Sequence, residues 1–151
     1  MIRGDEYWMR RALDIAIAGG DAGEVPVGAI IVDGDGRLVA ETRNSPIALH
    51  DPTAHAEILA IRAAGAAVAN YRLDGMTIYC TLEPCPMCAG ALVNARLRRL
   101  VFGARDLRFG GVRSKFQIAD SELLNHSVEV VEGVLGGECT QILLGFFKTR
   151  R

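Results

Sequence analysis

The sequence lacks any hydrophobic run of membrane-spanning length, and residues 1–6 contain no hydrophobic signal segment. It also lacks a charge excess: 17 basic and 18 acidic side chains give a formal net charge of −1, so bulk charge does not indicate a nucleic-acid binder. Low-complexity and disorder-prone segments are absent as well. These absences favour a folded protein that does not enter the membrane, and we expect it in the cytoplasm.

Cysteine is scarce, and two of the four cysteines, Cys85 and Cys88, lie close together. In a reducing cytosol, a C-x₂-C pair is more typical of metal-binding thiolates than of a disulfide. Apolar residues make up 50% of the 151 residues, which is enough for a sizeable core. We expect a single domain over residues 1–151, because no linker or internal repeat interrupts the chain.

Helical and strand patterns alternate along the chain, which predicts an α/β fold. The first helix is predicted over residues 5–18, where Gly19-Gly20 ends it. A hairpin turn at residues 33–36 joins the first two strands. The other predicted elements are strands at 25–32, 37–42, 76–81, 99–102 and 128–131, and helices at 84–96 and 136–149.

Two short motifs about thirty residues apart carry the chemistry, and their sequences are His55-Ala56-Glu57 and Pro84-Cys85-Pro86-Met87-Cys88. The spacing of Cys85 and Cys88 closes on one metal ion, and His55 can add a third ligand. A zinc ion with three protein ligands keeps a position open for water, as in catalytic zinc sites. Glu57 is then the natural proton carrier for that water.

The predicted setting of both motifs favours this chemistry. Asp51 and Pro52 predict the start of a helix, running to about Ala64, that carries the first motif in its first turn. The second motif falls in the first turn of the helix predicted over residues 84–96. Because helix N-termini carry partial positive charge and free N–H groups, both positions favour a thiolate over a thiol and stabilise a bound hydroxide.

Two plainer alternatives are a pair of buried free cysteines and a closed structural zinc site. A closed site needs a fourth protein ligand, and the candidates are Cys80, His50, His126 and Cys139. Cys80 falls within a predicted strand and Cys139 on an apolar helix face, which predicts core cysteines. Both histidines fall in polar, loop-like segments, from which either could contact a substrate.

The order H-A-E followed by P-C-x-x-C is the signature of the zinc-dependent cytidine-deaminase superfamily. Beyond this signature, the chain resembles the bacterial tRNA-specific adenosine deaminases over nearly its whole length. The positions that carry the resemblance are 6–10, 24–29, 44, 51–58, 70–73, 81–85, 87–91 and 101–106.

The resemblance implies a three-layer α/β/α cytidine-deaminase-like fold with a five-stranded mixed sheet, a homodimer, and one zinc ion per chain held by His55, Cys85 and Cys88. It also implies hydrolytic conversion of adenosine to inosine at the wobble position of a tRNA anticodon loop. In this chemistry zinc hydroxide attacks C6 of adenine, while Glu57 shuttles protons to N1 and to the departing amine.

The same resemblance assigns substrate contacts. Asn44 and the backbone around Ala56 are implied to hold the base, with Val27 packing near it. Asn44 also precedes Ser45-Pro46, where an asparagine is typical of a turn. Asp106 is implied to accept a hydrogen bond from a ribose hydroxyl.

Basic residues are concentrated near the middle and at the end of the chain. Residues 96–115 contain seven basic side chains and one acid, and the C-terminus adds Lys148, Arg150 and Arg151 after Phe146 and Phe147. A basic strip beside aromatic residues can follow single-stranded RNA, and we expect Phe147 and Arg150 to contact it. A solvated charged face is the plainer alternative.

One segment departs from the family pattern. After Asp106 the relatives carry a small-residue run resembling G-A-x-G-S, whereas this chain has Phe109 before Gly110-Gly111 and Arg113 before Ser114. A deaminase of free nucleobases or nucleosides, such as guanine or cytosine, therefore stays open as an alternative. A zinc-stabilised RNA-binding subunit without chemistry is a second alternative, against which the acid at position 57 argues.

Overall fold

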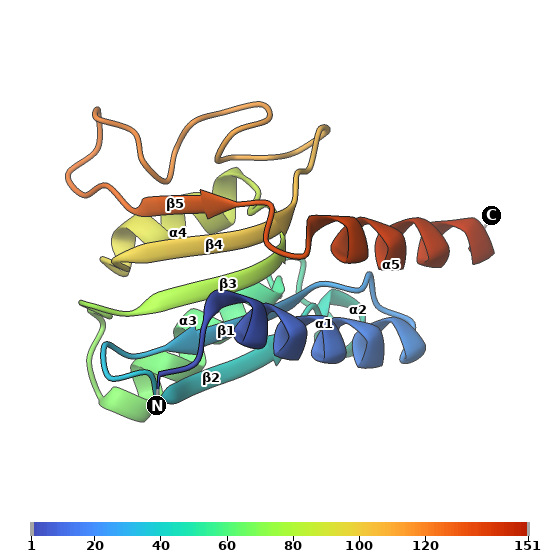
Figure 1. Cartoon of the computed structure of the whole chain (residues 1–151), viewed down its shortest axis with the longest axis horizontal. Coiled ribbons are helices and arrows are strands. Elements are labelled where there is room, and N and C mark those ends of the chain that lie inside the picture. Colours follow the sequence, from blue (N-terminus) through green and yellow to red (C-terminus); the bar gives the residue numbers. More distant parts are fainter. Residues whose placement is uncertain (1, 151) are drawn as a thin grey trace.

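A five-stranded mixed sheet forms the centre of the fold in the computed structural model, which describes residues 2–150 (Figure 1). Its strand order is β2-β1-β3-β4-β5. The pairs β1–β2 and β1–β3 are antiparallel, whereas β3–β4 and β4–β5 are parallel. The strands are β1 (Gly28–Val32), β2 (Leu38–Arg43), β3 (Thr77–Leu82), β4 (Arg99–Ala104) and β5 (Glu129–Glu132).

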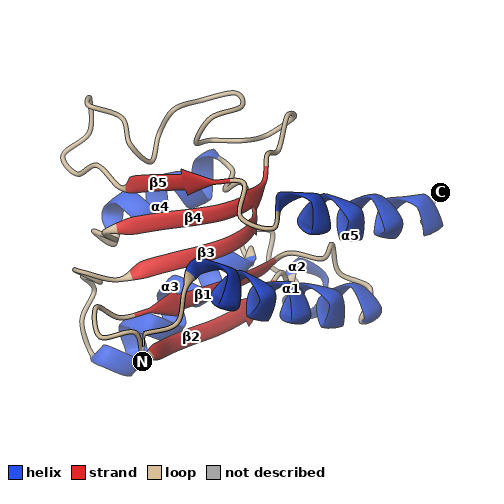
Figure 2. Ribbon diagram, in the orientation of Figure 1, coloured by secondary structure: helices blue, strands red, loops and turns tan. Residues whose placement is uncertain are grey.

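Helices cover both faces of the sheet, with α1 and α5 on one side and α3 and α4 on the other (Figure 2). The predicted three-layer α/β/α architecture is therefore confirmed. Within residues 2–150, no helix is both long and apolar enough to span a bilayer. The helices are α1 (Asp5–Asp21), α2 (Pro46–Leu49), α3 (Ala56–Val68), α4 (Pro86–Asn94) and α5 (Gly136–Thr149).

Alternating side chains of β1 fill two separate cores. Ala29 and Ile31 pack into the core beneath α3 and α4, whereas Ile30 and Val32 pack into the core beneath α1. Successive strand residues face opposite sides of a sheet, so each face of β1 meets its own helices. The whole strand is buried, as expected where helices cover both faces.

The first helix continues through the glycine pair to Asp21, so the prediction that these glycines end it is wrong. A Cβ on Gly19 would lie 3.2 Å from the side chain of Arg43, which indicates that glycine is used here for close packing. The chain instead leaves the helical path at Gly23, whose φ of 94° favours glycine.

The helix predicted to begin at Asp51-Pro52 begins at Ala56 instead. Oδ1 of Asp51 accepts hydrogen bonds from the N–H of Thr53 (2.8 Å) and from its hydroxyl (2.7 Å), which closes a side-chain turn in place of a helix cap. His55 consequently precedes the helix with extended backbone, at ψ 151°.

The ends of the other predicted elements lie within about three residues of the observed ends. This difference is only slightly larger than the one or two residues by which assignments of the same element usually differ. The helix predicted over residues 136–149 matches α5 at both ends. The hairpin turn at 33–36 is also confirmed, since Oδ1 of Asp33 accepts the N–H groups of Asp35 and Arg37. The short helix α2 was not predicted.

An ion pair ties the start of α1 to the sheet. The guanidinium of Arg99 on β4 donates two hydrogen bonds to the carboxylate of Asp5, at 2.8 and 2.6 Å. The hydroxyl of Tyr79 on β3 donates a third, at 2.8 Å. The Arg99 hydrogen bonds outweigh the opposing effect of burial and hold the pKa of Asp5 below its usual value.

We expect Asp5→Asn to lower the free energy of unfolding by about 1–3 kcal/mol at neutral pH, because Arg99 loses its charged partner. The pKa of Asp5 is lower in the folded state, so its stabilisation is present above the unfolded pKa and is lost as the pH falls through the folded pKa. Urea unfolding at neutral and at strongly acidic pH measures this difference. Asp14→Asn, on the exposed side of the same helix, is the control. A deficit that persists unchanged in acid would contradict the assignment.

Candidate active site

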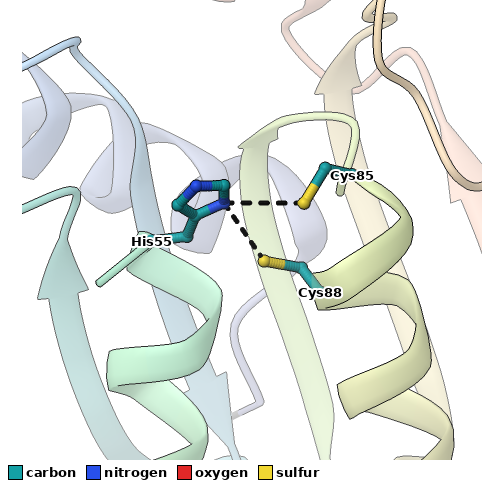
Figure 3. A group of neighbouring side chains, drawn as sticks. All are labelled: His55, Cys85 and Cys88. Carbon is teal, nitrogen blue, oxygen red and sulfur yellow. Dashed lines mark hydrogen bonds between the residues drawn. The ribbon is translucent and has the colours of Figure 1, made fainter. Parts of the chain in front are cut away.

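The two sequence motifs meet at one end of the sheet, where α3 and α4 both begin. His55 is the cap residue before α3 and Cys85 the cap residue before α4, so both stand just outside the first turn in which they were predicted. Cys88 lies within the first turn of α4. Figure 3 shows the three side chains pointing toward one another between the two helix starts.

The distances from the histidine nitrogen to the two sulfur atoms are those that a tetrahedral zinc ion requires. Nδ1 of His55 lies 3.5 Å from Sγ of Cys85 and 3.4 Å from Sγ of Cys88, and all three atoms lie within 4.8 Å of one another. Zinc–nitrogen bonds of about 2.0–2.1 Å and zinc–sulfur bonds of about 2.3 Å, at a tetrahedral angle, place N and S about 3.5 Å apart. These residues therefore fit a zinc ion.

The other candidate ligands lie elsewhere. Cys80 and Cys139 are fully buried in the two cores on opposite faces of the sheet. Nε2 of His126 lies 2.7 Å from the carbonyl oxygen of Leu97, and His50 is the exposed residue that ends α2. Over residues 2–150 the metal-binding group thus contains three side chains, which matches a site with an open fourth position.

Local hydrogen bonds favour the thiolate of Cys85. The hydrogen bond from Cys88, with a further one from His55, outweighs burial and lowers the pKa of Cys85 to about 4. The partial positive charge at the N-terminus of α4 acts in the same direction. A thiolate is the form of cysteine that binds zinc.

Glu57 lies in the first turn of α3 and is 4% exposed. Burial raises the pKa of its carboxyl to about 7. A carboxyl with such a pKa can both accept and donate a proton at neutral pH. It is not one of the three residues of the metal-binding group, so it is available as an acid–base group.

A pocket of ≈350 Å³ opens onto these residues. Val27, Asn44 and Asp106 line it together with His55 and Glu57, so three of the predicted substrate contacts share one cavity with the metal motif. Both apolar and polar side chains surround the space, as is usual for small planar ligands. The remaining lining residues are Val25, Leu82, Glu83, Cys85, Pro86 and Phe109.

Ala56 can take part only through its backbone. Its side chain is fully buried in the core, and its carbonyl oxygen accepts the hydroxyl of Thr42 at 2.7 Å. Its N–H belongs to the first turn of α3, where amides lack an intrahelical partner.

The basic residues predicted to form one strip are divided between two ends of the sheet. Arg99 begins β4 and Arg105 follows its other end, roughly 20 Å away by the rise of a strand. Acidic side chains from outside the segment 96–115 neutralise several of them, as ion pairs engage Arg98, Arg99, Arg105 and Arg113. The charge pattern along the chain therefore overstates the free positive surface.

Phe147 and Arg150 lie against different cavities. Phe147 lines an apolar groove of ≈570 Å³ that shares Phe109 with the pocket. Arg150 lies 4.5 Å over the ring of Phe146, in a separate cavity against α1. The structure thus brings Phe147 next to the pocket and leaves Arg150 apart from it. Arg151 lies outside the described residues.

The loop that departs from the family pattern places its two unusual side chains differently. Arg113 pairs with Asp120 at 2.9 Å and with Glu132 at 3.6 Å, and it does not line the pocket. Phe109 is 60% exposed and does line it.

Sequence reasoning missed Glu83, which is a nearly fully buried acid. Its only signal in the sequence is its position between a buried strand and the metal motif.

The fold and the His-Cys-Cys group beside a buried glutamate define a cytidine-deaminase-like deaminase. The chain matches the MafB19-like deaminase family over residues 4–151. It is 48% identical to the tRNA-specific adenosine deaminase of Haemophilus influenzae over 147 residues, which cover 97% of this chain and 85% of that relative. The chain belongs to the family of tRNA-specific adenosine deaminases.

Solved structures agree with this assignment. A tRNA:A34 deaminase, studied for A-to-I editing at the wobble position of transfer RNA, has a TM-score of 0.87 at 42% identity, covering 91% of this chain and 99% of its own. The guanine deaminase of Nitrosomonas europaea has a TM-score of 0.84 at 25% identity, covering 97% and 85%. The shared backbone therefore accommodates different substrates, and sequence identity over nearly the whole chain favours the tRNA enzymes.

We expect Cys88→Ala to lose most of its bound zinc, because the change removes one of three protein ligands. Elemental analysis of the purified protein gives the zinc content per chain. Cys139→Ala removes an equally buried cysteine from the opposite core and should keep the wild-type content. Full zinc retention by Cys88→Ala would overturn the ligand assignment.

Proposed function

We propose that the protein binds one zinc ion per chain through His55, Cys85 and Cys88, and that it deaminates adenosine to inosine at the wobble position of a tRNA anticodon loop. One observation carries the proposal: two members of the ligand triad, His55 and Cys85, line one pocket with the buried Glu57, in a chain 48% identical to a tRNA-specific adenosine deaminase. The geometry supports the chemistry, and the family relationship supports the substrate.

Zinc bound at the triad supplies a Lewis acid that lowers the pKa of a water molecule to about 7. Glu57 accepts a proton from the attacking water and delivers it to N1 of adenine as the oxygen adds to C6. The same carboxyl then takes the remaining proton from the hydroxyl added at C6 and passes it to the amine, so the C6–N bond breaks, ammonia leaves and the C6 carbonyl of inosine forms. Burial of Glu57 keeps bulk water from competing for these protons.

The base is held by Asn44 and Val27. The backbone N–H of Asn44 donates to the carbonyl of Val27 at 3.0 Å, which fixes the two residues relative to each other. The Asn44 amide supplies both a donor and an acceptor for the edge of a base, and Val27 supplies an apolar contact for its face. Asp106 lies at the pocket as an acceptor for a ribose 2′-hydroxyl.

A substrate panel tests this proposal directly. Purified protein is incubated with anticodon stem-loop RNA, free guanine, cytosine and adenosine, and ammonia release is measured for each. Deamination of the stem-loop supports the proposal. Turnover of guanine or cytosine without turnover of the RNA would replace it with the free-base alternative, and RNA binding without ammonia release would favour the silent subunit.

We expect Glu57→Gln to keep its zinc and to lose turnover by about 10²–10⁴-fold or more, because the amide cannot carry the proton. Zinc content and ammonia release are measured on the same preparation. Retention of near-normal activity would remove Glu57 from the mechanism. Loss of zinc would instead assign it to the metal site.

We expect Phe147→Ala to weaken stem-loop binding, because Phe147 is half exposed in the groove beside the pocket, where a base can stack. Tyr71→Ala removes an exposed aromatic side chain elsewhere and serves as the control. Fluorescence anisotropy measures both affinities over a salt titration, in which each phosphate contact contributes a slope of about −0.7 on single-stranded RNA. Equal affinities for the two variants would exclude the groove from the RNA contact.

We also propose that the protein acts as a homodimer in the cytoplasm. The family resemblance supports the dimer, as do large apolar side chains that remain exposed, among them Phe116 and Leu123 at 59% and 94% exposure. The four free cysteines suit a reducing compartment.

A further inference from the structure

A buried carboxylate holds the loop that forms one wall of the pocket. Glu83 follows β3 directly and is 2% exposed. Its two oxygens accept hydrogen bonds from the loop at residues 106–114. The donors are the N–H groups of Asp106 (3.1 Å), Val112 (3.1 Å), Arg113 (2.7 Å) and Ser114 (3.0 Å), and the hydroxyl of Ser114.

The loop is also pressed against the metal motif. The N–H of Gly111 donates to the carbonyl of Pro84 at 2.8 Å, and a Cβ on Gly111 would lie 2.9 Å from the carbonyl oxygen of Cys85. A Cβ on Gly110 would collide with the carboxylate of Glu83. Both glycines therefore stand where the loop has no room for a side chain.

The hydrogen bonds explain why a charge is buried here. A carboxylate is costly to bury unless hydrogen bonds replace its hydration, and four backbone amides with one hydroxyl do so. The loop in turn forms no helix or strand, so its amides need partners outside regular structure. The carboxylate therefore accepts hydrogen bonds from the loop amides, and these amides replace the hydration of the carboxylate.

The loop carries two residues to the pocket. Oε1 of Glu83 accepts the N–H of Asp106, and Oδ1 of Asp106 accepts the N–H groups of Arg108 and Phe109, each at 3.1 Å. A chain of hydrogen bonds therefore runs from Glu83 through Asp106 to Phe109. Asp106 and Phe109 both line the pocket.

We propose that Glu83 is a positioning residue, which holds residues 106–114 so that Asp106 and Phe109 stand at the pocket before RNA arrives. This inference rests on the proposed function and names a determinant of substrate binding at the same site. Because the pocket wall is ordered before RNA binds, binding does not carry the entropy cost of ordering it. Loss of this order should therefore weaken substrate binding. Proton transfer by Glu57 is left unchanged.

Glu83→Gln tests the inference without changing the size of the side chain. An amide oxygen in place of Oε2 keeps the three N–H bonds from Val112, Arg113 and Ser114. The amide nitrogen of the glutamine then faces the N–H of Asp106. Because both groups are hydrogen-bond donors, the hydrogen bond to Asp106 is lost. Ser114→Ala is the matched control, because it removes the hydroxyl bond and keeps all four backbone bonds.

We expect Glu83→Gln to raise the KM for stem-loop RNA by about tenfold or more, with kcat within about threefold of wild type and zinc content unchanged. Ser114→Ala should stay within about threefold of wild type in KM and kcat. Gly110→Ala disturbs the same contact from the loop side and should also raise KM, which covers the case in which Glu83→Gln does not fold. Gly145→Ala, where a Cβ meets nothing within 4 Å, is its control.

Hydrogen exchange of the amides of residues 106–114, measured without RNA, reports on the loop independently of turnover. Faster exchange together with a raised KM supports the inference. Faster exchange with an unchanged KM overturns it, and so does loss of zinc in place of a raised KM. If the wild type does not turn over RNA, the proposed function fails. The KM comparison is then made on the free base that the panel identifies, where an unchanged KM likewise overturns the inference.

Discussion

Two helix N-termini that converge at one end of the sheet are the constraint on which the site depends. His55 and Cys85 precede α3 and α4, whose axes are held by the core beneath that face of the sheet. Because the ligands stand at the ends of packed elements, their separation is set by helix packing and not by loop conformation. The same placement aligns two helix dipoles with a site that must hold thiolates and developing negative charge.

Local patterns predicted most of the fold, and the misses have physical causes. The glycine pair in α1 looked like a helix end, but Gly19 packs against Arg43 from β2 and Gly20 against Pro26. Asp51 looked like a helix cap, but its carboxylate closes a turn onto Thr53. In both cases the residue type indicated that the local backbone departs from a regular pattern. The role of the residue, however, depends on the side chain or backbone group that it contacts in the fold.

Some residues of the site could likewise be predicted from local patterns, and others could not. The metal motif and Glu57 could be predicted because each of the two motifs is short and local in sequence, and their order matches the signature of the superfamily. The contribution of Glu83 could not, since its five hydrogen-bond donors belong to a loop more than twenty residues further along the chain. The ion pairs of the basic residues could not be predicted for a related reason: their acidic partners, among them Asp5 and Glu129, come from distant segments.

Main-chain N–H groups do most of the bonding between Glu83 and the pocket wall. Every residue type except proline supplies such a group, so the path of the loop depends little on the side chains it displays. Only the glycines at positions 110 and 111 are fixed by space. Exposed side chains such as Phe109 can therefore be exchanged over evolutionary time while the metal motif keeps its support. A wall built in this way lets one catalytic frame acquire new substrates by changing its lining alone.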